Sequence, residues 1–498
     1  MTRRPPARLL LPAALALCAL PPREATADVP APVELNGFSE VQGLRFADAD
    51  EDGIQDLMLV MGREVRVWRG VKGGPIRTAP TWIFTLPGDA TYAWPGRTLE
   101  GSNGAKAPTL LALGRGGALR LRPGLPPVVE EGLRVALRWA DPDRGVLTDF
   151  VRGTNLLLPY EFGWQWVPDW IGARARAFDL AVPPKRKVAS PGAFLEEGAV
   201  VTWEWPAPTL VPSWAPTGGP AAFVLGDDGL HAFSPKGDDA VQEAFWPTTF
   251  LPPVGDGRVV LADLDGDGTP DVCHEATTND SGTYTFFRTP PPAALGMRAR
   301  GGRVPAPAGD LRPARGKVKL SGFQFPPDYA DLDGDGRRDM AITTIDIDAS
   351  NIRRAIMQGR VVAKTRAFLN RSKAGAGEFF GAPDAEVDSD ILVKLRFTYS
   401  GSIEVKRSFT ILPTADLDGD GKKDLVIRTS PDTLAVRRGI GAGVWSEEPR
   451  TVAIPPMGKS PDLEAYAADL TGDGKDDLVL LYRAPPGGSD TIFFLQSP

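Results

Sequence analysis

Short apolar segments with strand-like composition flank an acidic turn at several places in the chain. GRVVLADL (257–264) precedes one such turn, SFTILPTADL (408–417) precedes another, and DLVIRT (424–429) follows the second. In the first case, a turn cluster TTNDSG (277–282) and the strand-like TYTFFRT (283–289) come next. β-branched and aromatic runs bounded by Gly, Asp, Asn and Ser are typical of strands and turns. The pattern therefore predicts a meander of strand, loop, strand, turn and strand.

One helical segment interrupts the β pattern. NIRRAIMQG (351–359) predicts a short helix capped by Ser350 or Asn351. RVVAKTRAFLNR (360–371) and ILVKLRFTYS (391–400) then alternate as strands do. These segments form an insertion over about 345–405. Insertions often carry binding, and a surface elaboration without a binding role is the alternative.

The acidic turn recurs five times in nearly the same form. The copies are ADADEDGIQDLMLV (47–60), ADLDGDGTPDVCHE (262–275), ADLDGDGRRDMAIT (330–343), ADLDGDGKKDLVI (415–427) and ADLTGDGKDDLVLL (468–481). The first aspartates of the last four copies lie 68, 85 and 53 residues apart, near the ~40–50 residues of familiar propeller repeats. Repeating one meander about seven times predicts an all-β fold, a seven-bladed β-propeller, with eight blades as the alternative.

The predicted propeller is one domain over residues 28–498. Residues 57–262 hold the blades that lack the motif, apart from a degenerate copy, ADPDRGVLTDFV (140–151), for which we predict no metal. The last repeat is one strand short after TIFFLQS (491–497), and VELNGF (33–38) has the composition of a strand. We expect the N-terminal strand to complete the last blade and close the ring.

The spacing of aspartates within each copy predicts a calcium site. Carboxylates at loop positions 1, 3 and 5 can converge on one point when glycine at position 6 permits a sharp turn. Hard oxygen ligands favour calcium over zinc or copper. An EF-hand also needs glutamate at position 12, but the five copies have Leu59, His274, Ile342, Ile427 and Leu480 there. Aspartate at position 9 closes the loop instead, and position 7 would contribute its backbone carbonyl.

The predicted ligands follow from these positions. They are Asp48, Asp50, Asp52, Ile54 and Asp56; Asp263, Asp265, Asp267, Thr269 and Asp271; Asp331, Asp333, Asp335, Arg337 and Asp339; Asp416, Asp418, Asp420, Lys422 and Asp424; and Asp469, Thr471, Asp473, Lys475 and Asp477. Thr471 replaces an aspartate, so the last site should be the weaker one. We expect up to five Ca²⁺ ions, with affinities of roughly 10⁻⁴–10⁻³ M.

These five loops, in the same strand context, resemble the FG-GAP/VCBS repeats that also occur in integrin α-subunits. The resemblance covers a little over half of the chain, because residues 57–262 match poorly. It implies a propeller with calcium in its hairpin loops, usually in adhesion or ligand binding. It does not imply one particular ligand.

The N-terminal segment and the charge indicate export and exclude some classes of partner. Residues 1–27 combine a basic start, the apolar LLLPAALALCAL (9–20) and small residues before Asp28, as in a signal peptide. Lipid attachment at Cys18 is the weaker alternative, because Leu17 is bulky. We therefore expect a secreted or periplasmic protein, and no later stretch is apolar enough to span a membrane. Cleavage changes the net charge from −7 to −10, which disfavours nucleic acid.

Catalytic chemistry finds little support in the sequence. Cleavage leaves Cys273 as the one cysteine, next to His274. Neighbours in a strand point to opposite faces, so we interpret Cys273 as a buried packing residue. Paired carboxylates are explained by the loops, so a glycosidase has no specific support. An enzyme is therefore less favoured than a non-catalytic protein.

Tryptophans in the motif-poor section are candidates for ligand contact. They are Trp164, Trp166, Trp170, Trp203, Trp205 and Trp214. Trp at i and i+2 lies on one face of a strand, where it can stack on a sugar, but packing between blades is the favoured interpretation. Three functions remain: a binding or adhesion module for protein or glycan ligands, a lectin or carbohydrate-active enzyme using the Trp-rich blades, or a scaffold within an envelope assembly.

Overall fold

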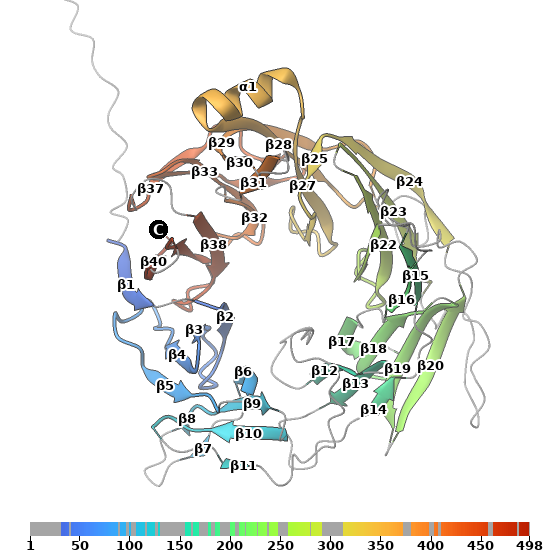
Figure 1. The fold of residues 1–498 in the computed structure, drawn as a ribbon. Helices are drawn as coiled ribbons and strands as arrows, with labels where there is room; N and C mark the ends of the chain where they lie inside the picture. The colour runs from blue at the N-terminus through green and yellow to red at the C-terminus, as the bar shows by residue number, and fades with distance from the viewer. Residues whose placement is uncertain are drawn as a thin grey trace, which may run out of the picture.

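Antiparallel sheets arranged around a central opening make up the protein (Figure 1). The computed structural model describes residues 31–38, 41–87, 90–95, 99–100, 106–114, 117–124, 128–129, 155–160, 163–168, 178–180, 185–189, 200–204, 209–214, 216–226, 228–236, 239–247, 257–278, 280–290, 312–371, 380–397, 403–406, 410–456, 462–485 and 488–497. The predicted signal peptide with Cys18, the degenerate loop at 140–151, Trp170 and Trp205 lie outside these residues.

Sheets of four or five strands follow one another along the chain. They are β2 (Gly43–Ala47), β3 (Asp56–Met61), β4 (Glu64–Trp68) and β5 (Trp82–Thr85); β6 (Ala90–Pro95), β9 (Leu110–Gly114), β10 (Gly117–Leu121) and β11 (Val128–Val129); β17 (Thr209–Trp214), β18 (Gly219–Leu225), β19 (Gly229–Lys236) and β20 (Asp239–Pro247); β21 (Gly257–Ala262), β22 (Asp271–Thr277), β23 (Ser281–Arg288) and β24 (Arg312–Ser321); β25 (Phe323–Gln324), β26 (Asp328–Ala330), β27 (Asp339–Ile345), β28 (Arg360–Phe368) and β29 (Ala385–Leu392); β32 (Ile411–Ala415), β33 (Asp424–Ser430), β34 (Thr433–Arg437) and β37 (Arg450–Ala453); and β38 (Asp462–Ala468), β39 (Asp477–Arg483), β40 (Asp490–Leu495) and β1 (Val33–Phe38).

Smaller sheets complete the described strands. They are β12 (Asn155–Tyr160), β13 (Gly163–Pro168) and β14 (Phe178–Leu180); β15 (Lys185–Ala189) and β16 (Val200–Glu204); β7 (Leu99–Glu100) and β8 (Lys106–Ala107); β30 (Lys394–Phe397) and β31 (Ile403–Lys406); and β35 (Gly439–Gly441) and β36 (Val444–Trp445).

The predicted meander is confirmed by the strand pairing. β21 pairs antiparallel with β22, β22 with β23 and β23 with β24, in the order in which they occur in the chain. Two adjacent sheets contact each other through alternating side chains of the second strand. In β27, Met340 and Ile342 belong to the apolar cluster shared with β22 and β23, whereas Ala341 belongs to the cluster shared with β33. The strand is therefore buried on both faces, because side chains alternate with a period of two.

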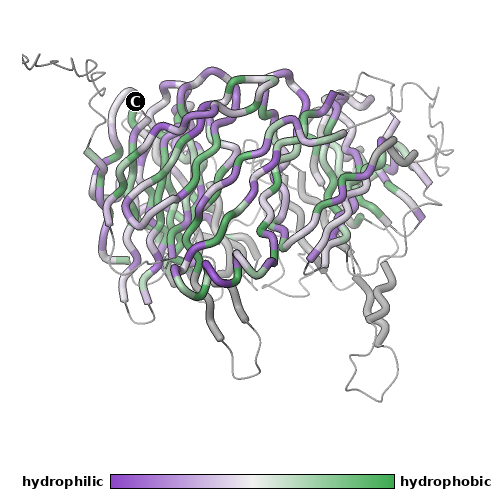
Figure 2. Tube along the Cα trace, turned by 90° about the horizontal axis from the view of Figure 1, so that it is seen from above, coloured by the Kyte–Doolittle hydropathy of each residue, from purple (hydrophilic) through white to green (hydrophobic). Residues whose placement is uncertain are grey.

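The same alternation recurs around the ring. Seen edge-on, apolar stretches lie within the layer of strands (Figure 2). Leu478 and Leu480 of β39 pack toward β33 and β34, and Val479 and Leu481 pack toward β1 and β3. Each cluster joins two neighbouring sheets, so burial of apolar surface holds the sheets to one another as well as within themselves.

The N-terminal strand closes the ring, as the sequence predicted. β1 pairs with β40 antiparallel, with Val33 opposite Phe494 and Leu35 opposite Ile492 (Figure 1). Phe38 is 1% exposed and meets Trp68 edge-on at 5.8 Å between ring centroids. The first described strand is thereby fixed to the last strand and to the first sheet.

The insertion contains the predicted helix, with a different cap. α1 (Ala349–Gln358) begins after Asp348, whose side chain accepts a hydrogen bond from Asn351 N at 2.7 Å. The prediction of Ser350 or Asn351 as the cap was wrong, because the chain turns into the helix two residues earlier. Asn351 is instead buried and bonds to Asp346 O and to the backbone of Val362. The predicted strand at 391–400 is divided between β29 and β30.

Candidate metal centres and central cavity

The five acidic loops occupy equivalent places in five sheets. We call them loop 1 (48–56), loop 2 (263–271), loop 3 (331–339), loop 4 (416–424) and loop 5 (469–477). Each joins two consecutive strands: β2 to β3, β21 to β22, β26 to β27, β32 to β33 and β38 to β39. Of these, β2, β32 and β38 border the central opening (Figure 1). The loops are therefore copies of one structural unit.

Backbone N–H groups shape each loop around its first aspartate. In loop 3, Asp331 accepts hydrogen bonds from Gly334 N and Gly336 N, both at 2.8 Å. Gly336, at position 6, has a φ of 86°, in the left-handed region that glycine adopts without steric cost. Loop 1 departs from the pattern at position 4, where Glu51 takes a φ of 58° in place of glycine.

The position-9 aspartate fixes the loop to the third strand of its sheet. Asp56 is fully buried and accepts hydrogen bonds from Ala49 N and Gly70 N, both at 2.8 Å. The other copies are Asp271 with Leu264 N and Thr289 N, Asp339 with Leu332 N and Asn370 N, Asp424 with Leu417 N and Gly439 N, and Asp477 with Leu470 N and Ser497 N. Sequence reasoning assigned this residue to the metal and missed its second role as a clamp.

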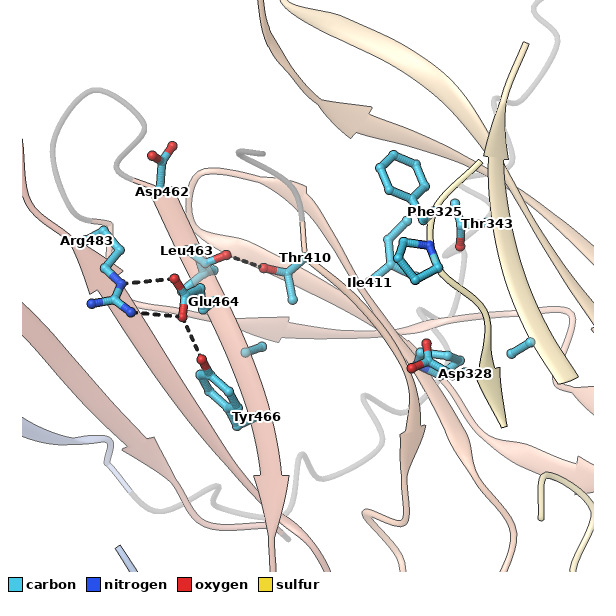
Figure 3. Close-up of a pocket in the computed structure, with 14 residues that line it drawn as sticks. Phe325, Asp328, Thr343, Thr410, Ile411, Asp462, Leu463, Glu464, Tyr466 and Arg483 are labelled. Atoms are coloured by element: carbon cyan, nitrogen blue, oxygen red, sulfur yellow. Dashed lines mark hydrogen bonds and ion pairs between the residues drawn. The ribbon is translucent and has the colours of Figure 1, made fainter. Parts of the chain in front are cut away.

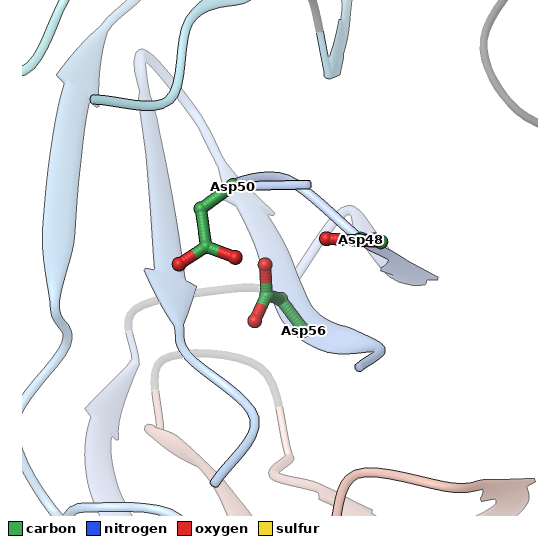
Figure 4. Close-up of side chains that lie close together, drawn as sticks. All are labelled: Asp48, Asp50 and Asp56. Atoms are coloured by element: carbon green, nitrogen blue, oxygen red, sulfur yellow. The ribbon is translucent and has the colours of Figure 1, made fainter. Parts of the chain in front are cut away.

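The carboxylates of loops 1 to 4 converge. Oxygens within 4.8 Å of one another come from positions 1, 3 and 9 in loops 1, 2 and 3, and from positions 1, 3 and 5 in loop 4. In loop 1 the three side chains are Asp48, Asp50 and Asp56 (Figure 4). Loop 5, with Thr471 at position 3, is not among the carboxylate groups found in the described residues. The weaker affinity expected of the fifth site stays a prediction.

One buried oxygen tests whether these loops fit a cation. Asp50 is 6% exposed and its Oδ1 has no hydrogen-bond partner. An unpaired buried carboxylate oxygen is costly, and its neighbours in the cluster are further carboxylates. Oxygens at this spacing suit a hard cation such as Ca²⁺, which oxygen ligands bind at about 2.3–2.6 Å. Asp267 Oδ2 in loop 2 is similarly buried without a partner.

Burial and mutual repulsion shift the titration of the loop carboxylates. Burial raises the pKa of Asp56 and of Asp339 to about 7, against the backbone hydrogen bonds that lower it. Burial and the charge of Asp265 raise the pKa of Asp267 to about 6. The charged forms are thus disfavoured in the absence of a cation, and a bound cation would offset that cost.

An arginine at the end of the third strand or directly after it reaches the carboxylates in three of the loops. Arg69 Nε lies 2.6 Å from Asp50 Oδ2, and its Nη2 lies 2.8 Å from Asp52 Oδ2. Arg288 is paired with Asp265, and Arg438 is paired with Asp418 and Asp420. Each arginine directly precedes the residue that donates to the position-9 clamp. Sequence reasoning missed these residues, because they lie outside the acidic motif.

Backbone hydrogen bonds connect neighbouring loops across the sheet boundaries. Arg338 N of loop 3 donates to Leu264 O of loop 2 at 3.1 Å, and Lys423 N of loop 4 donates to Leu332 O of loop 3 at 3.1 Å. Asp476 N of loop 5 donates to Asp416 O of loop 4 at 2.7 Å. Val71 N, beyond β4, donates to Leu470 O of loop 5 at 3.0 Å, which continues the contacts into the first sheet. The five loops therefore form one continuous arc.

A cavity of about 730 Å³ lies between the strands that border the opening. Its walls come from β26, β27, β32, β38 and β39 (Figure 3). Glu464 bonds to Arg483 Nε at 2.9 Å and accepts a hydrogen bond from Tyr466 Oη at 2.6 Å. Burial acts to raise the pKa of Glu464, but these hydrogen bonds outweigh it and lower the pKa. Asp328 lies on the facing wall (Figure 3). The cavity thus has a mixed polar and apolar lining, with a fixed ion pair on one side.

The described part of the Trp-rich section favours packing. Trp214 is 1% exposed and contacts Phe223 and Trp246 edge-on. This burial agrees with the favoured packing interpretation of Trp214 and contradicts its role as an exposed ligand-binding candidate. Trp164 and Trp166 lie on β13 and Trp203 lies on β16, where their proposed ligand contact stays a prediction.

Cys273 is a packing residue. It is 1% exposed in the core cluster formed with Met340 and Phe286, and burial raises the pKa of its thiol well above the ordinary value. A thiol with a raised pKa is a poor nucleophile.

The radial antiparallel sheets and their acidic loops define an all-β protein with a repeated loop unit. Residues 416–480 match the FG-GAP-like repeat family. This match includes loops 4 and 5 with the strands between them, so the family resemblance seen in the motif is confirmed there. No curated protein matches the chain.

Solved structures that are similar to the chain are distant in sequence. One is BBS1N in complex with ARL6DN, with 10% identity, a TM-score of 0.35, and coverage of 93% of this chain and 97% of that one. Another is an Agrocybe aegerita lectin that recognises non-reducing terminal N-acetylglucosamine, with 13% identity, a TM-score of 0.31, and coverage of 93% and 94%. A third is the V. cholerae biofilm matrix protein Bap1, with 11% identity, a TM-score of 0.30, and coverage of 94% and 88%.

In the described part of this chain, helices of the length and hydrophobicity needed to cross a membrane are absent.

Proposed function

We propose that this protein is an exported, calcium-stabilised β-propeller that acts as a non-catalytic binding module for a protein or glycan ligand. The observation that carries the proposal is the arc of acidic loops, four of which have converging carboxylates and all of which are clamped to their own sheets. Among the described residues, seven sheets have four or five strands, and the smaller sheets β12–β14 and β15–β16 lie between β11 and β17 in the chain, which supports seven or eight blades. The FG-GAP-like repeat at residues 416–480 supports the assignment as a propeller with a repeated loop unit.

Calcium in this proposal serves the scaffold. Loops 1 to 4 would hold the ion with carboxylates of positions 1, 3, 5 and 9, and its positive charge would remove the repulsion between them. Since loops 2 to 5 are hydrogen-bonded one to the next, an ion in one of them would also hold the neighbouring sheet in place. The ligand would then bind a rigid surface, which lowers the entropy cost of association.

Thermal unfolding of the mature chain, residues 28–498, tests the calcium part. At free calcium about tenfold above Kd, each occupied site should add about 1.4 kcal/mol to the free energy of unfolding. The melting temperature should therefore rise with calcium and fall with excess EDTA, and magnesium at equal ionic strength is the control. Identical curves in calcium and EDTA would contradict the proposal.

The central cavity is our candidate for the ligand site, because it combines polar groups, Phe325 and Tyr466 on facing walls. A glycan array probed in calcium separates glycan from protein ligands. A hit that is lost in Asp328→Ala and kept in Asp388→Ala, an exposed aspartate on β29, would support a glycan site in the cavity. Turnover of a polysaccharide would instead favour the enzyme alternative.

A further inference from the structure

A small cavity lies at the boundary between the sheet that carries loop 4 and the sheet that carries loop 5. Its volume is about 200 Å³, and its apolar walls are Val436 and Val452 on the first sheet and Leu478 and Leu495 on the second. These side chains pack in or against the apolar cluster that the two sheets share. We call it the β37–β40 cavity, after the strands that hold Val452 and Leu495 (Figure 1). A cavity of about 150 Å³ holds a benzene ring, so an aromatic side chain fits this one.

At other sheet boundaries, a connection of the chain covers the corresponding place. Phe380, between β28 and β29, packs at the boundary of the loop 2 and loop 3 sheets. Trp445, between β34 and β37, packs at that of the loop 3 and loop 4 sheets, and Ile76, between β4 and β5, at that of the loop 5 and loop 1 sheets. All three are buried. Phe380 meets Phe286 at 4.7 Å between ring centroids, and Phe286 is the counterpart of Val436 in its own sheet.

The β37–β40 cavity lacks such a cover because of the way in which the ring closes. In the loop 5 sheet the third strand is β40, and the fourth is β1, which comes from the N-terminal part of the chain. No connection therefore runs from the third strand to the fourth in this sheet. The described residues that follow β40 and line the cavity are Gln496 and Ser497, which bring no aromatic or aliphatic side chain to it.

An arginine at the cavity adds a charge to the apolar walls. Arg450 is exposed on β37, opposite Val436 on β34. The corresponding residues on the fourth strands of the loop 3 and loop 5 sheets are Ala385 and Val33. Among the described residues, Arg450 has no hydrogen-bond or ion-pair partner. Its guanidinium is therefore available to a group that enters the cavity.

The acidic residues that line the same cavity already have partners. Asp418 is paired with Arg438. Asp424 accepts hydrogen bonds from Leu417 N at 2.9 Å and from Gly439 N at 2.7 Å. The charge that these walls leave unpaired is thus positive, and a guanidinium binds a carboxylate in a bidentate geometry.

We propose that the β37–β40 cavity is a docking site for a segment of a partner protein, which inserts an aromatic side chain and presents a carboxylate to Arg450. A polypeptide is the occupant because a polypeptide connection covers each of the three equivalent places, with an aromatic ring at two of them. The carboxylate follows from the charge of Arg450, which replaces apolar residues of the equivalent strands. This site is separate from the central cavity and requires no bound ion.

Titration of the mature chain with a short peptide, followed by ligand-observed NMR, tests the proposal. The probe is acetyl-Gly-Trp-Asp-Gly-amide, and the control peptides carry Ala in place of Trp or Asn in place of Asp. The parent protein should bind the probe with a Kd on the order of 1 mM, as expected for a ligand of this size in a small site. Each control peptide should bind about tenfold more weakly, through loss of the buried ring or of the charged hydrogen bonds.

Two variants of the protein locate the binding. Arg450→Gln should weaken binding of the probe about tenfold and leave binding of the Asn peptide unchanged. Val452→Phe fills the cavity, so it should abolish binding while the melting temperature stays at or above that of the parent, which separates a filled site from an unfolded protein. Arg353→Gln is the matched control, because Arg353 is an exposed arginine on α1; it should bind the probe as the parent does.

The proposal is overturned if the parent does not bind the probe at about tenfold above the expected Kd, or if binding survives both Arg450→Gln and Val452→Phe. Binding that is lost in Asp328→Ala and kept in Arg450→Gln would place the probe in the central cavity and would also overturn it. Binding of the probe by a protein whose melting temperature ignores calcium would support this site and contradict the calcium part of the proposed function, so the two failures are distinguishable.

Discussion

At the scale of single residues, the loops depend on close packing of backbone atoms as well as on charge. Gly70 donates to Asp56 and lies where loops 1 and 5 meet. A Cβ at this position would lie 2.3 Å from Gln55 O and 2.9 Å from Leu470 O. Both are backbone atoms of different sheets, so neither can move aside without shifting its loop.

Gly70→Ala should therefore destabilise the protein by about 1–3 kcal/mol, the usual cost of overpacking. Urea unfolding in EDTA measures this without a contribution from metal. Gly74→Ala is the control, because a Cβ there would lie 3.6 Å from Val71 Cγ1, an ordinary contact. Equal stability of the two variants would show that the junction between loops 1 and 5 is looser than the structure has it.

At the scale of elements, the second strand of each sheet sets the packing, and the insertion adds a capped helix. β27 is buried along its whole length, which explains why such strands are apolar at consecutive positions. α1 begins at a cap that the sequence pattern did not select, because Asp, Ser and Asn stand in near succession at 348–351. All three types favour the cap position, and only the path of the chain distinguishes among them.

Asp348→Ala should lower the free energy of unfolding of the insertion by about 1 kcal/mol through loss of the cap. Ser350→Ala should have little effect, since Ser350 is within the helix and exposed. Circular dichroism with urea unfolding compares the two. A larger loss of unfolding free energy in Ser350→Ala than in Asp348→Ala would show that Ser350, which the sequence suggested, caps the helix.

At the scale of the whole molecule, two sets of long-range contacts close and connect the ring. β1 adds a strand to the last sheet, and the arc of loops joins sheet to sheet through backbone hydrogen bonds. The pairing of β1 with β40 involves no acidic loop, whereas the hydrogen bonds of the arc are made by the acidic loops that would hold the metal. The two should therefore respond differently to calcium.

Removal of residues 28–38 should lower the melting temperature in both calcium and EDTA. The deletion exposes the core face of β40 and leaves a sheet edge unpaired. Phe38→Ala offers a milder test, with an expected cost of about 3–5 kcal/mol for a buried phenylalanine. An unchanged melting temperature after both changes would contradict closure by β1.

Calcium should slow hydrogen exchange at the amides that connect the loops. Arg338 N, Lys423 N and Asp476 N donate across sheet boundaries, so ordering of the loops should protect the peptides that contain them. The hairpin of β33 and β34 serves as the control, because its amides are paired within one sheet. Equal protection with and without calcium would show that ordering of the loops does not help to hold neighbouring sheets together.

The sequence by itself determined the features that rest on local spacing. Five aspartate motifs with glycine at position 6 identified the loops, and a strand pattern at each end of the chain predicted the closure that β1 provides. These two predictions depend on residues within one loop or on a regular alternation of apolar and polar residues along a strand. The ligand atoms and the number of ions stay predictions.

The tertiary structure alone decided which distant residues meet the loops. Asp56 accepts a hydrogen bond from Gly70 N, and Asp265 forms an ion pair with Arg288. Both contacts arise because the third strand runs back along the second and ends beside the loop. Trp214 proved to be buried because neighbouring strands cover it. Pairing of strands from separate parts of the chain creates these contacts, and the acidic motif carries no local signal of the residue that will face it.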